Sequence, residues 1–230
     1  MKNTKINLKV ISKVAKALGE LNDRVVYVGG AIVSLYINDP AAEDIRPTKD
    51  IDISLEILTL GELENLRILL NEKKFYQTSD ETVMCRFIYD DVTVDVMSTK
   101  AVGWAPSDQW FAPGFKHVET KNIEGQQIQI LPLAYFLATK FSAFNDRGAK
   151  DPRTSKDFED ITYILDNRVD LIEQIINSPG DVKQYLKSEF KIILSDSDLQ
   201  EAIIANLFYE TQVVRYKKIV NKLNAIVSHI

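Results

Sequence analysis

The chain has 230 residues, 45% hydrophobic and 27% charged, which is enough for one large or two small domains with a buried core. Its net charge of −5 excludes the overall basic field typical of many nucleic-acid-binding proteins, but leaves room for a local basic patch. The single cysteine excludes an internal disulfide and a cysteine-rich zinc site. Without a signal-peptide pattern or an apolar run near ~20 residues, we expect a cytoplasmic protein with no membrane partner.

Hydrophobic periodicity predicts alternating helices and strands over the first 130 residues. The first four predicted elements are a helix at 6–21, a buried strand at 24–28, a helix at 30–36 and, after a proline-containing loop at 38–47, a strand at 49–55. A helix at 60–73 follows. Two hairpins are then predicted, one from strands 82–88 and 93–97 around an acidic turn, the other from strands 117–123 and 126–130, with an irregular aromatic segment at 100–113 between them.

The character of the chain changes after Pro132, where helical spacing dominates. The predicted helices span residues 133–144, 155–166, 169–176, 182–193, 199–208 and 213–227. We therefore predict an α/β domain over residues 1–131 and a helical domain over residues 132–230.

Three aspartates on predicted strands are the candidate catalytic residues. Asp50 and Asp52 alternate with Ile51 and Ile53, so their carboxylates project to the same face. Asp95 lies on a later strand among apolar neighbours, where an isolated acid is costly to bury. If these strands are neighbours, the three carboxylates suit two Mg²⁺ ions, one lowering the pKa of an attacking hydroxyl and the other holding a triphosphate.

The Gly29-Gly30 pair between a strand and a helix is the candidate phosphate-binding corner. Its backbone N–H groups can approach a phosphate without hindrance, and the helix N-terminus adds partial positive charge. Ser34, one helical turn further, could add a hydroxyl, and Thr48 either binds substrate or caps the loop before the acids. A glycine pair alone is equally well explained by a tight turn, and an alternating aspartate pair alone is more often a solvated strand edge.

The order of these motifs resembles the DNA polymerase β-like nucleotidyltransferase superfamily. The resemblance rests on Gly29-Gly30, on the run Arg46-Pro47-Thr48-Lys49-Asp50-Ile51-Asp52 and on Asp95, and it is greatest for the AbiEii-like toxin and resistance branch. It implies an α+β fold, in which a mixed sheet flanked by helices is followed by an all-helical domain. It also implies transfer of a nucleoside monophosphate from a nucleoside triphosphate (NTP), with the three aspartates as metal ligands and Asp95 also as the base.

The sequence departs from that superfamily at two places. Gly30 stands where a serine usually follows the first glycine. Val33-Ser34 replaces the Arg-Asp pair of the CCA-adding enzymes, which argues against their activity.

A cationic stretch in the helical half resembles an AbiEii-like segment, in which a helix lysine precedes a Lys-Asp loop. The resemblance implies that Lys140 contacts the triphosphate, that Arg147 and Lys156 contact phosphates or the acceptor, and that Asp157 orients one of these cations. Lys150 and Arg153 belong to the same stretch. Two structural explanations compete with these roles, because Lys140 could snorkel from a buried helix and Asp157 could form a capping box with Thr154.

The leading hypothesis is a Mg²⁺-dependent nucleotidyltransferase that uses ATP or another NTP. Its acceptor would be an RNA end, a protein side chain or a small-molecule hydroxyl. A toxin of the AbiEii-like kind would also have an antitoxin partner, which only the resemblance implies. The alternative is a catalytically degenerate module of the same fold that binds nucleotide or a protein partner. A metal-dependent phosphohydrolase would call for more than the two histidines present.

Overall fold

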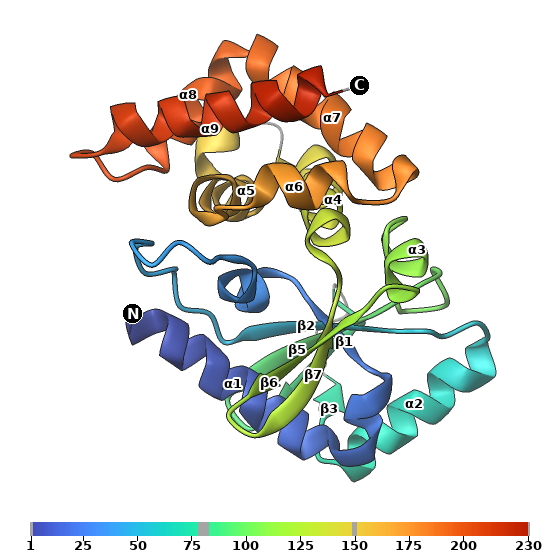
Figure 1. Cartoon of the computed structure of the whole chain (residues 1–230). Coiled ribbons are helices and arrows are strands. Elements are labelled where there is room, and N and C mark those ends of the chain that lie inside the picture. The colour runs from blue at the N-terminus through green and yellow to red at the C-terminus, as the bar shows by residue number, and fades with distance from the viewer. Residues whose placement is uncertain (1, 78–82, 149–150, 230) are drawn as a thin grey trace. The chain divides into compact units, whose positions relative to one another are not determined.

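The computed structural model describes residues 2–77, 83–148 and 151–229, and it divides the chain into two compact units (Figure 1). The first unit comprises residues 1–34 and 43–132. The second comprises residues 35–42 and 133–230. A short piece of the N-terminal half therefore belongs to the helical unit, although the sequence pattern shows a single change of character at Pro132.

A mixed β-sheet is the framework of the first unit. In the described residues it has seven strands in the order β3-β4-β5-β2-β1-β7-β6. The central strand β2 pairs antiparallel with β1 and parallel with β5, and β1 pairs parallel with β7. This mixed sheet with helices confirms the predicted α+β class. The strands are β1 (Val26–Val28), β2 (Asp50–Leu55), β3 (Tyr76–Gln77), β4 (Arg86–Tyr89), β5 (Val92–Ser98), β6 (Glu119–Ile123) and β7 (Gln126–Ile130).

Alternation along β2 and β5 separates an apolar face of the sheet from a polar face. Ile51 and Ile53 on β2, and Val94 and Val96 on β5, are fully or almost fully buried, whereas the aspartates between them keep some exposure. Helices α1 (Lys2–Leu18) and α2 (Leu60–Glu72) lie below β2 in the view of Figure 1. Helix α1 buries one apolar stripe, and Thr59 begins α2 with a capping box.

Several boundaries in the first unit differ from the predicted ones. The segment after the glycine pair is the 3₁₀ helix η2 (Gly30–Tyr36) rather than an α-helix, and another 3₁₀ helix, η1 (Gly19–Arg24), follows α1. The irregular aromatic segment contains the short helix α3 (Phe111–Phe115). Both predicted hairpins form, with positive φ at Asp90 in the first turn and at Glu124 and Gly125 in the second. The predicted strand start at Thr82 lies outside the described residues.

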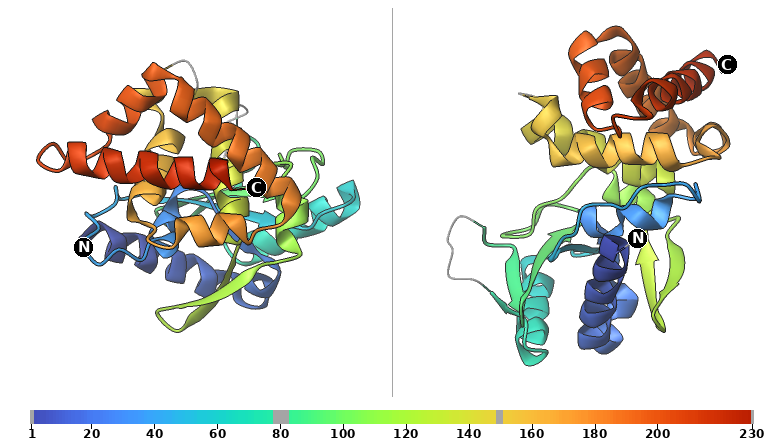
Figure 2. Two further views of the ribbon diagram at one scale, coloured as in Figure 1. Left: turned by 45° about the horizontal axis from the view of Figure 1, so that its top comes forward. Right: turned by 90° about the vertical axis from the view of Figure 1, so that its left-hand side faces the viewer.

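The second unit is helical apart from its turns, and α4 (Leu133–Ala143) lies within it (Figure 2). Helix α4 is apolar on nearly all sides, which is typical of a helix surrounded by others. Ser155 caps helix α5, because its hydroxyl accepts from the Phe158 N–H, so the predicted capping box between Thr154 and Asp157 is wrong. The other elements are η3 (Phe144–Gly148), η4 (Pro152–Thr154), α5 (Lys156–Asn167), α6 (Leu171–Ile176), α7 (Gly180–Ser195), α8 (Ser197–Ala205) and α9 (Gln212–Ser228).

Segment 35–42 contacts α4, α5 and α9 inside the second unit. The Tyr36 ring stacks on Phe136 with 4.2 Å between ring centroids. The backbone N–H groups of Asn38 and Asp39 both donate to the Asn167 carbonyl, at 3.2 and 3.0 Å. Lys218 on α9 adds an ion pair to Asp39 at 3.2 Å. These contacts explain why the segment belongs to the helical unit.

In the part of the chain that the structure describes, none of the helices combines the length and the apolar character needed to cross a bilayer.

Candidate active site

The acidic face of the sheet is centred on β2 and β5. Asp52 lies directly opposite Asp95 on the neighbouring parallel strand, and Asp50 lies opposite Thr93. Parallel partners in adjacent strands are about 4.8 Å apart and share a face, so Asp52 and Asp95 are side by side. Asp50 occupies the next position on that face, at the exposed end of β2. The sequence placed these acids on separate strands, and the structure makes those strands neighbours.

Gly29 forms a corner directly beside Asp52. It follows β1, whose last residue, Val28, is the antiparallel partner of Asp52. Its φ of +72° is in the left-handed region that favours glycine. A Cβ on this residue would overlap the Asp52 carboxylate, because Oδ2 lies where that carbon would be. The glycine therefore lets a carboxylate lie against bare backbone at the entry to η2.

Arg86 holds the third acid, and sequence reasoning missed it. Its Nε donates to Asp95 Oδ1 and its Nη2 to Asp95 Oδ2, both at 2.8 Å, in a bidentate pair. The two side chains are 35% and 18% exposed, and this hydrogen-bonded carboxylate raises the pKa of Arg86. The register was a usable signal, since counting back from the two-residue turn at Asp90-Asp91 places Arg86 opposite Asp95.

The residues around the glycine corner have mixed roles. Thr48 Oγ1 accepts from the Asp50 N–H at 3.0 Å, so this hydroxyl caps the start of β2. Gly30 begins η2, and Ser34 lies in its last turn. The Ser34 hydroxyl is buried and, among the described residues, has no hydrogen-bond partner. A buried hydroxyl in that state is costly unless a ligand or water bonds to it.

The donor set suits Mg²⁺ at Asp50 and Asp52. Carboxylate oxygens are hard ligands, and Mg²⁺ commonly takes one or two of them and completes its shell with water and phosphate. In the described residues, no group of three or more His, Cys, Asp or Glu side chains has a spacing that could hold a metal ion. Asp95 is already paired with Arg86, so its negative charge is partly neutralised before any metal binds.

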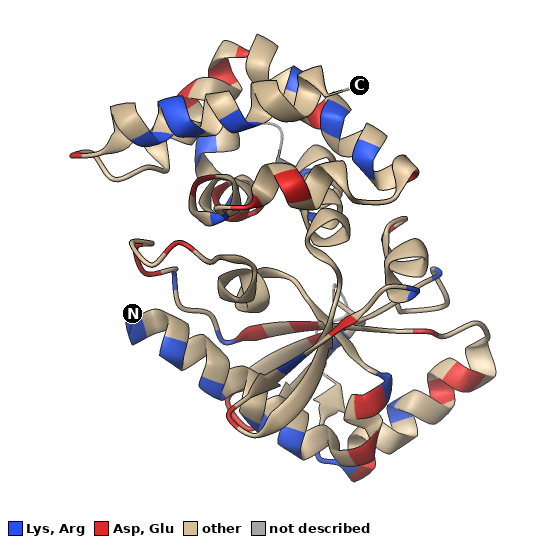
Figure 3. Cartoon of the chain, viewed as in Figure 1, with Lys and Arg blue, Asp and Glu red and all other residues tan. Residues whose placement is uncertain are grey.

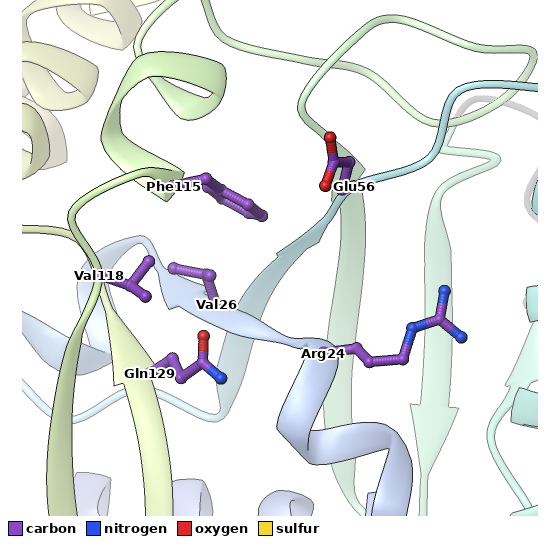
Figure 4. Close-up of a pocket in the computed structure, with 6 residues that line it drawn as sticks. All are labelled: Arg24, Val26, Glu56, Phe115, Val118 and Gln129. Atoms are coloured by element: carbon purple, nitrogen blue, oxygen red, sulfur yellow. The ribbon is translucent and has the colours of Figure 1, made fainter.

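A pocket of about 240 Å³ lies beside β1 in the first unit (Figure 4). Val26 lines it and is in register with Ser54, two residues beyond Asp52 on β2. Glu56 lines the other side of the pocket. It follows Asp52 after about 13 Å of extended chain, at ~3.3 Å per residue. Figure 4 shows the Phe115 ring pointing over Val26. The lining combines apolar and polar groups, namely Arg24, Val26, Glu56, Phe115, Val118 and Gln129.

The predicted cationic residues form an ion-pair cluster in the second unit. Lys140 is buried, and its ammonium donates to Asp157 at 3.2 Å and to Asp160 at 2.7 Å. Arg147 pairs with the second oxygen of Asp157 at 3.0 Å. Burial opposes ionisation of Asp157, but Lys140 and Arg147 hold its pKa below the usual value. Asp157 thus orients two cations, and Lys140 has two carboxylate partners within its own unit.

The other members of the cationic stretch lie nearer the surface of the second unit. Lys156, the first residue of α5, is exposed. Arg147 is 70% exposed in spite of its ion pair. Arg153 pairs with Asp151 at 3.1 Å, and Lys150 lies outside the described residues. Contact of Lys140, Arg147, Lys156 and Asp157 with a nucleotide stays a prediction.

Comparisons with known proteins agree with the architecture. No protein-family model matches the chain, and no curated protein matches its sequence. The fold is similar to that of an antigenic nucleotidyltransferase-like protein from Paracoccidioides brasiliensis, at a TM-score of 0.50 and 19% identity over 87% of this chain and 93% of that one. The antibiotic-resistance factor ANT(2'')-Ia has a TM-score of 0.49 at 12% identity, with 82% and 95% covered. The first likeness shows that the fold is nucleotidyltransferase-like.

Proposed function

We propose that this chain is a Mg²⁺-dependent nucleotidyltransferase that moves a nucleoside monophosphate from an NTP to an acceptor hydroxyl and releases pyrophosphate. The observation that carries the proposal is the arrangement of Asp50 and Asp52 on one strand, with Asp95 opposite Asp52 and the Gly29 corner against the Asp52 carboxylate. The nucleotidyltransferase-like fold supports the same reaction class.

Each group in this arrangement has a role in the proposed reaction. Bound Mg²⁺ would supply the charge that lowers the pKa of the acceptor hydroxyl and neutralises the triphosphate. Asp50 and Asp52 would hold the ion, and the backbone at Gly29 and Gly30 would bind phosphate oxygens. Asp95, once Arg86 releases it, would accept the hydroxyl proton. The pocket beside Phe115 gives room for the part of the nucleotide or acceptor that extends away from the reacting atoms.

A second candidate is a binding module of the same fold without turnover. The Arg86–Asp95 pair favours it, because a bidentate arginine already neutralises the acid that would serve as base. In that case the chain would bind an NTP at the glycine corner and leave it intact.

The decisive experiment incubates the protein with Mg²⁺ and each α-³²P-labelled NTP. Transfer of the label is then measured to total RNA, to a protein lysate and to a set of small molecules that carry amino and hydroxyl groups. We expect one acceptor class to be labelled, with labelling lowered roughly a hundredfold or more in Asp50→Asn and in Asp52→Asn. Asp23→Asn, the same chemical change at an exposed residue of the first unit, is the control and should label normally.

Two results would decide against catalysis. Undiminished labelling in Asp50→Asn would remove the acids from the reaction. Calorimetric binding of NTP without labelling of any acceptor would favour the binding module. Mn²⁺ binding, followed by electron paramagnetic resonance, measures the metal site independently of turnover and should weaken in both aspartate variants.

A further inference from the structure

Helix α1 carries a row of lysines in a protein that is acidic overall. Its sequence has five lysines and no acidic residue, against a net charge of −5 for the chain. Figure 3 shows these basic residues as successive blue bands along α1. At 100° per residue, the five positions fall within an arc of about 80°, and the row is about 21 Å long. The row, called here the lysine stripe, consists of Lys2, Lys5, Lys9, Lys13 and Lys16.

The lysine stripe is a surface feature that the fold itself does not need. The apolar stripe of α1, with Ile11, Val14 and Leu18, is buried, whereas Lys2, Lys5, Lys9 and Lys16 are exposed. The N-terminus of α1 already has a carboxylate partner from outside the helix, because Asp44 accepts from the Asn3 and Thr4 N–H groups at 2.7 and 3.0 Å. Among the described residues, no ion pair is recorded for these four exposed lysines, so their charge faces solvent.

The stripe is continuous with the end of the strand that carries the catalytic acids. Lys13 and Lys49 share the Asp91 carboxylate, at 2.9 and 2.8 Å. Lys49 directly precedes Asp50, the first of the acids. Asn7, on the same helix, accepts a hydrogen bond from the Thr48 N–H at 3.0 Å and donates one to the Arg46 carbonyl at 3.2 Å. Lys13 also pairs with Asp90 at 3.1 Å. The stripe therefore passes beside the loop that leads into Asp50.

We propose that the lysine stripe binds the phosphate backbone of a nucleic acid strand and so makes a nucleic acid the acceptor of the proposed transferase. The role of the nucleic acid as acceptor rests on the proposed function, whereas the binding itself does not. A row of about 21 Å is long enough to contact several phosphates of one extended strand. Phosphate contacts of this kind position a strand without reading its sequence.

The lack of an exposed apolar face on α1 favours this occupant over an anionic membrane. Helices that lie on a bilayer insert an apolar face beside their basic one. The apolar face of α1 is already buried in its own unit, and Ile6, the exposed large apolar residue on α1, is only 37% exposed. A purely electrostatic surface is the kind that binds nucleic acid backbones.

The test is fluorescence anisotropy with a 5′-fluorescein 20-nucleotide RNA of mixed sequence, measured against KCl concentration without NTP or Mg²⁺. The variant replaces Lys2, Lys5, Lys9 and Lys16 with Gln. We expect it to bind at least roughly tenfold more weakly at low salt, and to lower the slope of log K against log [KCl] by about 3, since each lost phosphate contact removes ~0.7.

A matched control variant replaces four exposed lysines elsewhere with Gln and has the same net charge of −9, because −5 less four positive charges is −9. It should bind within about twofold of the wild type. The stripe variant should be about as stable as the wild type in thermal unfolding, since the four replaced lysines are exposed on the surface of α1. The control positions are Lys74, Lys116, Lys191 and Lys217.

Three outcomes would overturn the proposal. They are absence of RNA binding by the wild type, equal weakening in both variants, and stripe-dependent binding to phosphatidylserine vesicles without binding to RNA. Asp50→Asn should still bind the RNA probe. Normal RNA binding with no labelling from any NTP would therefore refute the transferase function and leave the binding surface in place.

Discussion

At the scale of single residues, the site depends on the close approach of Asp52 to bare backbone at Gly29. Gly29→Ala is predicted to displace the Asp52 carboxylate, because the new methyl group would overlap it. The alanine would also have to adopt a φ of +72°. We expect Mn²⁺ affinity and label transfer to fall roughly tenfold or more, together with a stability loss above the ~1–2 kcal/mol cost of a left-handed alanine.

Gly125→Ala is the matched control for that change. Gly125 has a φ of +85°, but a Cβ there would meet nothing within 4 Å. Its expected loss is about 1 kcal/mol from backbone strain alone, with metal binding unchanged. Equal effects of the two alanines on Mn²⁺ binding would show that the Asp52–Gly29 approach has no part in the site.

The individual acids could be predicted, but their partners could not be predicted equally well. Asp50 and Asp52 follow from alternation alone, and Asp95 from an acid set among apolar strand residues. Arg86 was within reach, because the turn fixes the hairpin register. Nothing local in the sequence indicates that the Ser34 hydroxyl is buried without a partner among the described residues, since its surroundings come from packing.

At the scale of elements, helices α4 and α5 are joined by a buried ion cluster. Lys140→Met keeps the length of the side chain and removes its charge, which leaves Asp157 and Asp160 buried with less compensation. We expect a loss of about 3–5 kcal/mol in the free energy of unfolding, measured by urea denaturation. Lys156→Met, at an exposed position of α5, should change it by less than about 0.5 kcal/mol.

A double variant separates this structural role from nucleotide binding. Lys140→Met with Asp160→Asn should recover part of the lost stability, because one uncompensated carboxylate is removed. A Lys140→Met protein of normal stability with a raised KM for NTP would instead make Lys140 a triphosphate ligand.

The elements themselves were largely predictable, whereas their end details were not. Apolar periodicity gives the existence of α1, α2 and the helices after Pro132, because those helices bury one stripe or are surrounded. It does not distinguish the 3₁₀ helix at Gly30–Tyr36 from an α-helix, since seven residues span too few turns. It also places the start of α5 one residue early, because two hydroxyl residues, Thr154 and Ser155, compete as cap.

At the scale of the whole molecule, distant segments meet at the C-terminal end of α5. Lys222 on α9 donates to the carbonyls of Leu165, Asp166 and Arg168, at 2.8, 3.1 and 2.8 Å. Burial lowers the pKa of Lys222 to about 8. The Asn167 carbonyl, in the same turn, holds segment 35–42. These hydrogen bonds connect segments that are more than a hundred positions apart in the sequence, so the titration of Lys222 should affect global unfolding.

The sign of the pH dependence follows from that lowered pKa. Below pH 8 the lysine is protonated in both the folded and the unfolded protein, so its contribution is constant. Between pH 8 and about 10.4, the unfolded chain keeps a proton that the folded protein has released, and stability contributed by Lys222 rises with pH.

Urea denaturation at several pH values can measure this contribution. The difference in unfolding free energy between wild type and Lys222→Met should increase from pH 8 to pH 10, while Lys217→Met, exposed on the same helix, should show no such trend. A flat difference would mean that the three carbonyls keep the ammonium protonated throughout.

Segment 35–42 has a consequence for how the chain connects the two units. The chain passes between them three times, at 34/35, 42/43 and 132/133. Two of these passages directly flank the glycine corner and the loop that leads into β2. The backbone between the glycine corner and β2 therefore belongs partly to the helical unit, and the acidic strand is covalently tied to that unit through its own loop.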